Sequence, residues 1–185
     1  MKKILVSMVA FSLFVWAQTF IQTDKASVTW TAFKTLAKVG VSGDFTDIKY
    51  TSGKKDGNTI SSIMVGSKIL IDSTKIDTKN VARDATISEM FFKKLTSPVI
   101  SGYIISLDEA KSTMKIRLSM GGVTKDIPMV YTFKDNIFKA TGTIDILDFG
   151  GLKALRSINK SCYDLHEGKT WNDVNILFST TVISK

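Results

Sequence analysis

The stretch that decides the fold runs from residue 113 to residue 148 and reads TMKIRLSM, GG, VTKDIPMVYTFK, DN, IFKATGTIDILD. Apolar and polar side chains alternate in its three longer segments, which is the pattern of strands with one buried and one exposed face. The two dipeptides between them, Gly121-Gly122 and Asp135-Asn136, are of hairpin length and consist of turn-forming residues. The stretch therefore predicts three consecutive antiparallel strands.

The alternating pattern recurs on both sides of this stretch, so we expect an all-β domain. The eight predicted strands are Ala26–Thr35, Val39–Thr51, Ile60–Asp72, Val99–Asp108, Thr113–Met120, Val123–Lys134, Ile137–Asp148 and Val174–Ser184. Residues 81–95 and 152–165 instead carry apolar side chains at intervals of three or four, which is typical of amphipathic helices. Asn80 is placed to cap the first helix, and Gly168 can end the second. We therefore predict two helices inserted between the strands.

Within each predicted strand the apolar residues share one face. In residues 113–120, for example, Met114, Ile116 and Leu118 lie on one face, and Lys115 and Arg117 lie on the other. A sheet with one dry face curls into an antiparallel barrel, and closure also removes exposed strand edges.

A barrel of about eight strands is either filled by side chains or holds one ligand. Small or adaptable residues on the dry face favour the hollow form, and a fully packed core with helical plugs is the alternative. These residues are Ala32, Met114, Met120, Ala140 and Gly142. Because methionine is more often a gap-filler than a ligand contact, the pattern leaves both forms open.

The N-terminal residues 1–17 have the order of a secretory signal peptide. Lys2 and Lys3 precede an apolar run from Ile4 to Trp16, and Ala17 is followed by polar residues. The apolar run is too short for a helix to cross the bilayer core. We therefore predict cleavage after Ala17 and export of residues 18–185, as one domain, to the periplasm or the extracellular space.

The composition excludes several classes of protein. A single cysteine, Cys162, rules out an internal disulfide and fits a buried apolar position. A single histidine, His166, makes the usual zinc sites and histidine-dependent triads hard to build. The formal net charge is +8, but nearly all the basic residues are lysines scattered along the chain. This pattern predicts no nucleic-acid binding and allows transient attraction to anionic membrane surfaces.

Fragments of catalytic motifs lack their partners. Gly168-Lys169-Thr170 looks like the end of a phosphate-binding loop, but Tyr163 stands where that loop needs its first glycine. Asp148-Phe149-Gly150 matches a kinase triplet, and no His-Arg-Asp loop accompanies it. His166 beside Glu167 could act as a general base, but no nucleophile is implied nearby. We predict no catalytic residue, metal or cofactor, and an enzyme acting on a lipid is the minor alternative.

Five short groups of residues together carry a resemblance to a known family. They are Ser27–Lys34, Val41–Phe45, Ile76–Thr78 with Arg83-Asp84 and Phe91-Phe92, Gly122–Lys125, and Asp148–Gly150. In this order they resemble the YceI-like family over nearly all of residues 18–185. The resemblance implies a lipocalin-like, extended antiparallel β-barrel in the periplasm or the secreted fraction. Together with the strand pattern, this predicts an eight-stranded antiparallel barrel with two inserted helices.

The same resemblance implies an apolar pore that holds a long-chain amphiphile, such as a polyisoprenoid quinone or a fatty-acid amide. Many relatives carry a histidine two residues after the Arg-Asp pair, where this chain has Thr86. The headgroup preference of those relatives therefore does not transfer to this chain.

The resemblance and the dry strand faces together indicate where a ligand would bind. The candidate wall residues on the strands are Val28, Trp30, Phe45, Ile69, Met114, Ile116, Leu118, Phe138, Ile144 and Phe178. Phe91 and Phe92 of the first helix are expected near the mouth of the pore, and Trp171 at its rim. Arg83 and Asp84 either fix that helix to the rim, as an ion pair or a cap, or bind the ligand headgroup.

The predicted function is a periplasmic or secreted protein that binds or carries a hydrophobic small molecule. The alternative is a packed β-barrel that acts as a protein-interaction or inhibitor module without a ligand. Association of two barrels into a homodimer is left open. The two functions differ in one physical respect, which is whether the interior is hollow.

Overall fold

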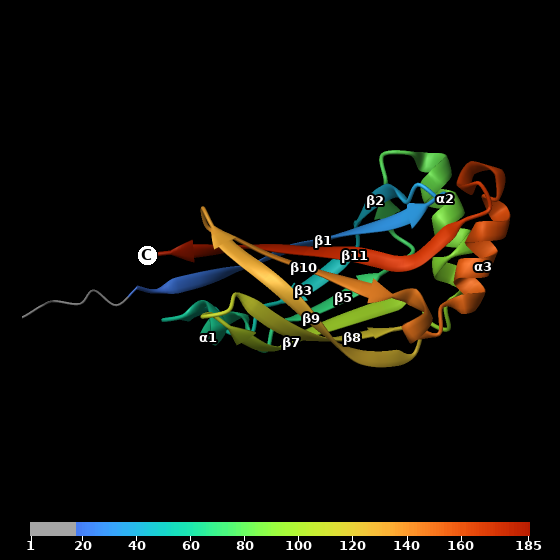
Figure 1. The fold of residues 1–185 in the computed structure, drawn as a ribbon. Helices are drawn as coiled ribbons and strands as arrows, with labels where there is room; N and C mark the ends of the chain where they lie inside the picture. Colours follow the sequence, from blue (N-terminus) through green and yellow to red (C-terminus); the bar gives the residue numbers. More distant parts are fainter. Residues whose placement is uncertain (1–17) are drawn as a thin grey trace, which may run out of the picture.

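One antiparallel sheet of eleven strands dominates residues 18–185, the part of the chain that the computed structural model describes (Figure 1). The strands are β1 (Phe20–Lys34), β2 (Val39–Phe45), β3 (Ile48–Thr51), β4 (Asp56–Gly57), β5 (Lys68–Asp72), β6 (Ile76–Asp77), β7 (Val99–Asp108), β8 (Thr113–Met120), β9 (Val123–Lys134), β10 (Ile137–Asp145) and β11 (Thr170–Ser184). Their order in the sheet is β3-β5-β7-β8-β9-β10-β11-β1-β2-β6, with β4 paired to β1. The predicted signal peptide lies outside the described residues.

The two predicted hairpins of the central stretch are confirmed. β8 pairs with β9, and β9 with β10, directly across the predicted turns. Gly121 and Gly122 have φ angles of 58° and 84°, and Asp135 and Asn136 have φ angles of 52° and 62°. Two consecutive positive φ angles give a turn whose twist matches that of paired strands, and these residue types adopt it at low cost.

Eight strands were expected, and most of the difference from eleven lies between residues 39 and 77. The expected strand Val39–Thr51 bends at residues 46–47 and becomes β2 and β3. The expected strand Ile60–Asp72 begins as a helix, α1 (Ile60–Met64), and becomes strand β5 only in its second half. The hydroxyl of Thr59 accepts the backbone N–H of Ser62 at 3.0 Å, and the Ser62 hydroxyl accepts that of Thr59 at 3.3 Å. This reciprocal capping starts a helix where alternation alone predicted a strand.

The sheet is curled, because β2 and β3 belong to one bent segment but pair with different neighbours. β2 pairs with β1, whereas β3 pairs with β5 at the other end of the strand order. Across the closure, the ring centroid of Tyr50 on β3 lies 5.7 Å from that of Phe178 on β11, and Gln22 on β1 donates a hydrogen bond to the Tyr50 hydroxyl. The predicted all-β, curled antiparallel architecture is therefore confirmed, while its strand count is not.

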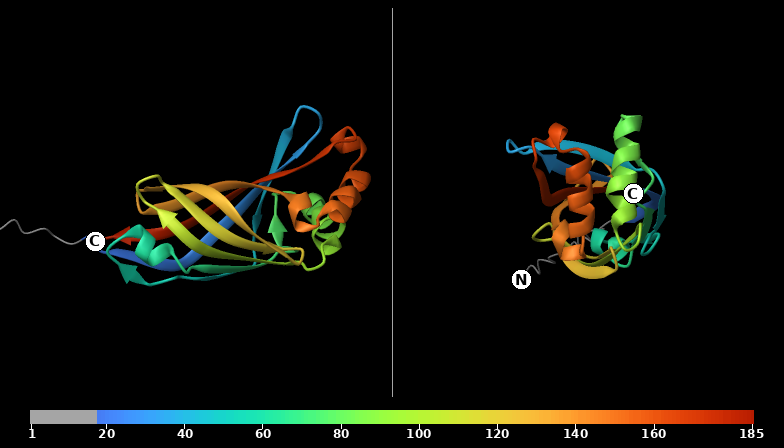
Figure 2. Two further views of the ribbon diagram at one scale, coloured as in Figure 1. Left: turned by 60° about the horizontal axis from the view of Figure 1, so that its bottom comes forward. Right: turned by 90° about the vertical axis from the view of Figure 1, so that its right-hand side faces the viewer.

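Helices cover the two ends of the curled sheet (Figure 2). α2 (Val81–Met90) and α3 (Leu152–Ser161) lie side by side over one end, and α1 lies at the other end, near the C-terminus. Both predicted helices are present but shorter than expected, since 3-10 turns η1 (Phe92–Lys94) and η3 (Asp164–His166) follow them. Asn80 caps α2 as predicted, because its Oδ1 accepts a backbone N–H of the first turn at 2.9 Å. Within residues 18–185, none of the helices has the length and apolar character needed to span a membrane.

The pairing of β9 with β10 stops partway along both strands. The last partners are Val130 on β9 and Thr141 on β10, and Pro128, two residues before Val130, has no N–H to donate to a ladder. The side chain of Met129 fills the space between the diverging strands, since a Cβ added at Gly142 would lie 2.9 Å from its Cγ. We call this place the β9–β10 seam.

A short helix closes the wide end of the β9–β10 seam. β10 ends at Asp145, three residues before its predicted end, and η2 (Ile146–Phe149) follows. Asp145 caps this turn, because its Oδ1 accepts the backbone N–H of Leu147 at 2.8 Å. An ion pair of 2.8 Å between Lys125 on β9 and Asp148 on η2 joins the two sides.

Candidate ligand-binding site

A cavity of about 510 Å³ lies inside the curled sheet, under α2 and α3. Its volume falls in the range of roughly 300–1,000 Å³ that ligand pockets occupy. The wall is mostly apolar, and both the strands and the helices contribute to it. We call the end near α2 and α3 the mouth and the opposite end, toward α1, the inner end.

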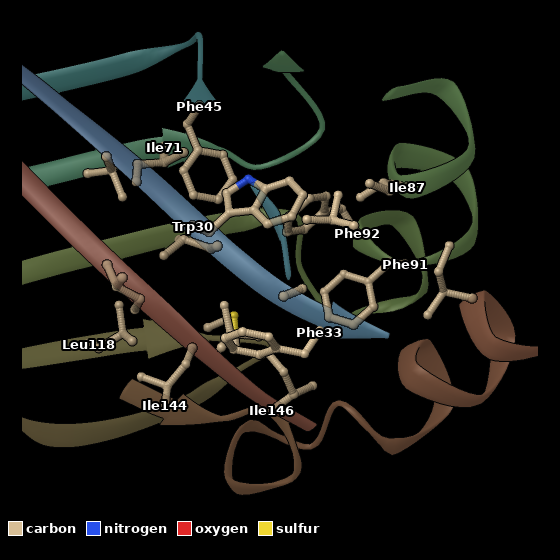
Figure 3. A pocket seen from close by; sticks show the side chains of 18 of the residues that line it. Trp30, Phe33, Phe45, Ile71, Ile87, Phe91, Phe92, Leu118, Ile144 and Ile146 are labelled. Carbon is tan, nitrogen blue, oxygen red and sulfur yellow. The ribbon is translucent and has the colours of Figure 1, made fainter. Parts of the chain in front are cut away.

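Aromatic side chains from several elements meet in this cavity (Figure 3). The ring of Phe92 on η1 packs edge to face against Phe45 on β2 and against Phe91, with centroids 5.7 and 5.2 Å apart. Trp30 on β1 lies beside Phe45 and is only 7% exposed. Gly43 on β2 makes room for its indole, because a Cβ at residue 43 would lie 2.5 Å from Cζ2 of Trp30. These rings form a rigid apolar wall near the mouth.

The structure brings nearly all of the predicted ligand residues around this cavity. The predicted residues in its wall are Val28, Trp30, Phe45, Ile69, Arg83, Phe91, Phe92, Met114, Ile116, Leu118, Ile144, Trp171 and Phe178. Phe138 and Asp84 lie outside the wall. Contact with a ligand stays a prediction for every residue of the set.

Phe138 points inward as alternation predicts, but side chains fill the interior at its level. Its ring stacks on Tyr131 with centroids 5.0 Å apart, and the residue is fully buried. Two of the small residues that favoured a hollow interior also lie outside the cavity wall. Ala140 is fully buried outside the cavity, and Gly142 packs under Met129. The cavity therefore occupies only the part of the barrel toward the mouth.

Arg83 and Asp84 are joined through Thr78. The carboxylate Oδ1 of Asp84 accepts both the backbone N–H and the hydroxyl of Thr78, at 2.8 and 2.6 Å. Arg83 donates from Nε to the Thr78 hydroxyl oxygen at 2.8 Å and from its terminal nitrogen to the Thr78 carbonyl at 2.6 Å. These bonds attach α2 to the segment after β6. The geometry matches the helix-fixing alternative, with Thr78 as the link in place of a direct ion pair.

Phe33 is a wall residue that alternation did not predict. In a regular strand its side chain would point away from the face that Trp30 and Ala32 share. The register between β1 and β11 shifts between Ala32 and Lys34, where one residue of β1 faces three of β11, and at this bulge Phe33 lies in the cavity wall (Figure 3). Lys34, on the face that Trp30 and Ala32 share, also lies in the wall. A bulge in the neighbouring strand has no signature in the alternation of β1, so the sequence offered no way to find Phe33, whereas Lys34 follows from alternation but was left out as a charged residue.

Trp171 lies within the last strand and not before it, because β11 begins four residues earlier than predicted. Its indole Nε1 donates to the backbone carbonyl of Thr35 at 2.7 Å. This bond holds the ring at the rim of the mouth, within the bulge of β11 that faces Phe33. The rim position predicted for Trp171 is therefore where the structure places it.

The apolar face of α3 supplies further wall residues that the sequence analysis left out. They include Leu155, Ile158 and Cys162. The thiol of Cys162 is partly buried, and this burial raises its pKa. The cysteine thus serves as an apolar wall residue, close to the buried position predicted for it.

His166 lies at the mouth, where the side chains of Thr170 and Asn159 determine which ring nitrogen carries the proton. The Thr170 hydroxyl donates its hydrogen to Oδ1 of Asn159 at 2.9 Å, so it accepts a hydrogen bond from Nδ1 of His166 at 2.7 Å. Burial lowers the pKa of His166, and the nearby charge of Lys34 lowers it further. The imidazole is therefore neutral at pH 7, with its proton on Nδ1.

The charges in the cavity wall are basic and lie at the mouth. Among the described residues, Lys34 and Arg83 are the charged side chains of this wall. Thr86, at the position of the family histidine, also lies there and donates its hydroxyl hydrogen to the carbonyl of Ala82 at 2.9 Å. Across residues 18–185, no group of three or more histidine, cysteine, aspartate or glutamate side chains is placed to hold a metal ion.

A comparison with protein families matches residues 20–182 to the YceI-like domain. The chain belongs to the YceI-like family. The match covers β1 through nearly all of β11, so every wall of the cavity lies within the YceI-like domain. A comparison with curated proteins finds no match.

Solved structures share the fold of this YceI-like chain at low sequence identity. BcnA of Burkholderia cenocepacia aligns with a TM-score of 0.59 and 15% identity, over 85% of this chain and 96% of that chain. A polyisoprenoid-binding domain from Saccharophagus degradans, implicated in plant cell wall breakdown, aligns with a TM-score of 0.57 and 12% identity, over 91% and 99%. The YceI protein of Campylobacter jejuni aligns with a TM-score of 0.53 and 17% identity, over 100% and 99%.

Proposed function

We propose that this protein binds or carries a long-chain amphiphile, of the polyisoprenoid or fatty-acyl type, in the periplasm or the secreted fraction. The apolar cavity of about 510 Å³ is the observation that carries the proposal. Membership of the YceI-like family and the polyisoprenoid-binding domain among the structural neighbours support it. The signal-peptide pattern of residues 1–17 supports export.

The energetics of burial are sufficient for such a role. Each buried methylene contributes about 0.8 kcal/mol, so a dozen methylenes supply roughly 10 kcal/mol before the costs of association. Loss of translational and conformational freedom removes several kcal/mol of this gain, which leaves an affinity of about micromolar or tighter. An interior packed throughout with side chains, the form that the inhibitor-module alternative needs, does not fit a cavity of this volume.

The surface supports loading and release at a membrane. The full chain carries a formal charge of +8, mostly from lysines, and the predicted cleavage after Ala17 removes only Lys2 and Lys3 of these. A lysine-rich surface is attracted to anionic headgroups, and such contact would let an amphiphile pass between the bilayer and the cavity without crossing water.

The direct test identifies what the purified protein carries. Native mass spectrometry of protein secreted by a cell that makes prenyl lipids should show a bound amphiphile, which organic extraction removes. The extracted protein should then take up an added prenyl quinone or fatty acid at a ratio of one per chain. Protein that carries no lipid and takes up neither probe would overturn the proposal.

A further inference from the structure

Polar side chains lie at the inner end of the cavity, away from the charges of the mouth. Tyr50 on β3 and Ser67, just before β5, both contribute to the cavity wall. Gln22 on β1 lies behind them and is only 4% exposed. Its Nε2 donates to the hydroxyl oxygens of Tyr50 and Ser67, the latter at 3.4 Å.

The hydrogen bonds of this group are incomplete. The Ser67 hydroxyl oxygen also accepts the backbone N–H of Gly53 at 3.0 Å, so the oxygens of Tyr50 and Ser67 both act as acceptors. Among residues 18–185, the side chains of Ser67 and Thr180 lie within hydrogen-bond reach of the Tyr50 hydroxyl, whereas Oε1 of Gln22 is buried without a donor. Turning the amide over would place Oε1 beside the two hydroxyl groups but would leave the N–H groups of Gln22 in the position that has no partner.

A buried polar group without a partner is costly, and native proteins satisfy nearly all such groups. Whichever way the Gln22 amide is oriented, this group has hydrogen-bonding capacity to spare beside a cavity. Burial raises the pKa of Tyr50, so its phenol stays protonated and neutral at physiological pH. No cation lies among the three side chains, whereas Lys34 and Arg83 line the mouth.

We propose that Tyr50 and Ser67 form an inner subsite that binds an uncharged oxygen, as a hydroxyl or carbonyl group, at the buried end of the ligand. The inference rests on the proposed function, because it needs a chain that fills the cavity. The ligand is then an amphiphile with a polar group at each end of an apolar chain. Its anionic or strongly polar group lies at the mouth, near Lys34 and Arg83, and its neutral oxygen lies at the inner end.

The test compares fatty acids with their ω-hydroxy derivatives of equal length, from laurate to stearate. The carboxylate holds each molecule at the basic mouth, so the ω-hydroxyl is carried inward. A hydroxyl buried without a partner weakens binding by about tenfold or more. In the wild-type protein we expect one chain length at which the ω-hydroxy acid binds at least as tightly as the plain acid. Weaker binding of the ω-hydroxy acid at every length would overturn the inner subsite.

Variants assign the effect to the two hydroxyls. Tyr50→Phe keeps the ring against Phe178, and Ser67→Ala removes the smaller group. At the preferred chain length, each should weaken the ω-hydroxy acid relative to the plain acid by about tenfold. Tyr131→Phe is the matched control, because Tyr131 is also buried but lies outside the cavity wall. The ratio of the two dissociation constants within one variant is independent of any general loss of stability.

The outcomes separate the two proposals. If plain fatty acids bind and Tyr50→Phe changes the ratio no more than Tyr131→Phe does, the inner subsite is wrong and the proposed function stands. If neither fatty acids nor prenyl quinones bind the extracted protein, the proposed function fails and the inner subsite fails with it.

Discussion

At the scale of single residues, Gly43 decides where the indole of Trp30 can lie. A Cβ at residue 43 would lie 2.5 Å from Cζ2 of Trp30 and 2.7 Å from Cγ2 of Thr78, both closer than packed atoms tolerate. We expect Gly43→Ala to destabilise the fold by about 1–3 kcal/mol, because the indole must shift. Urea unfolding followed by tryptophan fluorescence measures the change.

The control for that substitution is Gly40→Ala in the same strand. There the added Cβ would lie 3.3 Å from Cγ2 of Thr31, a mild crowding on the outer face. Equal losses of stability in the two variants would show that the position of Trp30 does not depend on Gly43.

The neutral state of His166 makes the stability depend on pH in a defined direction. Because burial lowers the pKa of the folded imidazole below its ordinary value, the unfolded chain takes up the proton more readily. The contribution of neutral His166 to the stability of the folded protein is complete at pH values above the ordinary histidine pKa. It is lost as the pH falls from that value through the lower pKa that His166 has in the folded protein. Urea midpoints between pH 8 and pH 5 should therefore fall more steeply for the wild type than for His166→Asn.

Asparagine suits this comparison because its amide nitrogen can take the place of Nδ1 and donate to Thr170. It does not titrate, so it removes the proton uptake and keeps the hydrogen bond. Parallel curves for the two proteins would mean that the environment of His166 does not shift its pKa.

At the scale of elements, the hydroxyl of Thr78 makes two of the four hydrogen bonds that attach α2 to the segment after β6. Thr78 is 5% exposed and connects Arg83 to Asp84. Thr78→Val keeps the shape of the side chain and removes both hydrogen bonds of the hydroxyl. We expect a loss of about 1–2 kcal/mol in the free energy of unfolding, measured by urea denaturation.

Thr86→Val is the matched change within α2. The hydroxyl of Thr86 binds only the carbonyl of Ala82 in its own helix. Its removal should change the stability by less than about 0.5 kcal/mol. A comparable loss in both variants would contradict the role given to Thr78.

The elements that the sequence predicted well are those with purely local causes. The turns at Gly121-Gly122 and Asp135-Asn136 need residues that tolerate positive φ, and alternation marks the strands that flank them. The helix α1 was missed, because Thr59 and Ser62 cap it reciprocally while its apolar residues also suit a strand. Competition between two local signals is decided by packing, which a single sequence does not show.

The site was predictable only where it follows from alternation. The inward faces of β1 and β8 gave correct wall positions such as Trp30 and Ile116. Phe33 depends on a bulge, and Phe138 depends on how far side chains fill the barrel. The inner polar residues Tyr50 and Ser67 come together through the pairing of β3 with β5, in which Thr51 lies opposite Lys68. Alternation within single strands did not predict this pairing.

At the scale of the whole molecule, a hollow region and a packed region share one barrel. Ala32 lies in the cavity wall, whereas Ala140 is fully buried outside it. We expect Ala32→Trp to keep the thermal stability and to abolish uptake of a prenyl quinone, since the indole can enter the cavity. Ala140→Trp should destabilise the fold by about 3 kcal/mol through overpacking. Thermal unfolding and ligand uptake measured on both variants check the prediction.

If Ala32→Trp bound the quinone as tightly as the wild type, the cavity would not be the binding site. If Ala140→Trp were as stable as the wild type, the packed region would contain space that the structure does not show.

The β9–β10 seam has a consequence for the range of cargo. A groove on the outer face of the sheet shares Met114, Met129 and Ile176 with the wall of the cavity, so one layer of side chains separates them at the seam. Widening the barrel there breaks no backbone ladder, because β9 and β10 are unpaired beyond Val130 and Thr141. The width of the barrel at the β9–β10 seam thus depends on the side chain of Met129, which is flexible. We therefore expect a barrel built this way to accept both a branched prenyl chain and a slimmer acyl chain while its strands stay paired elsewhere.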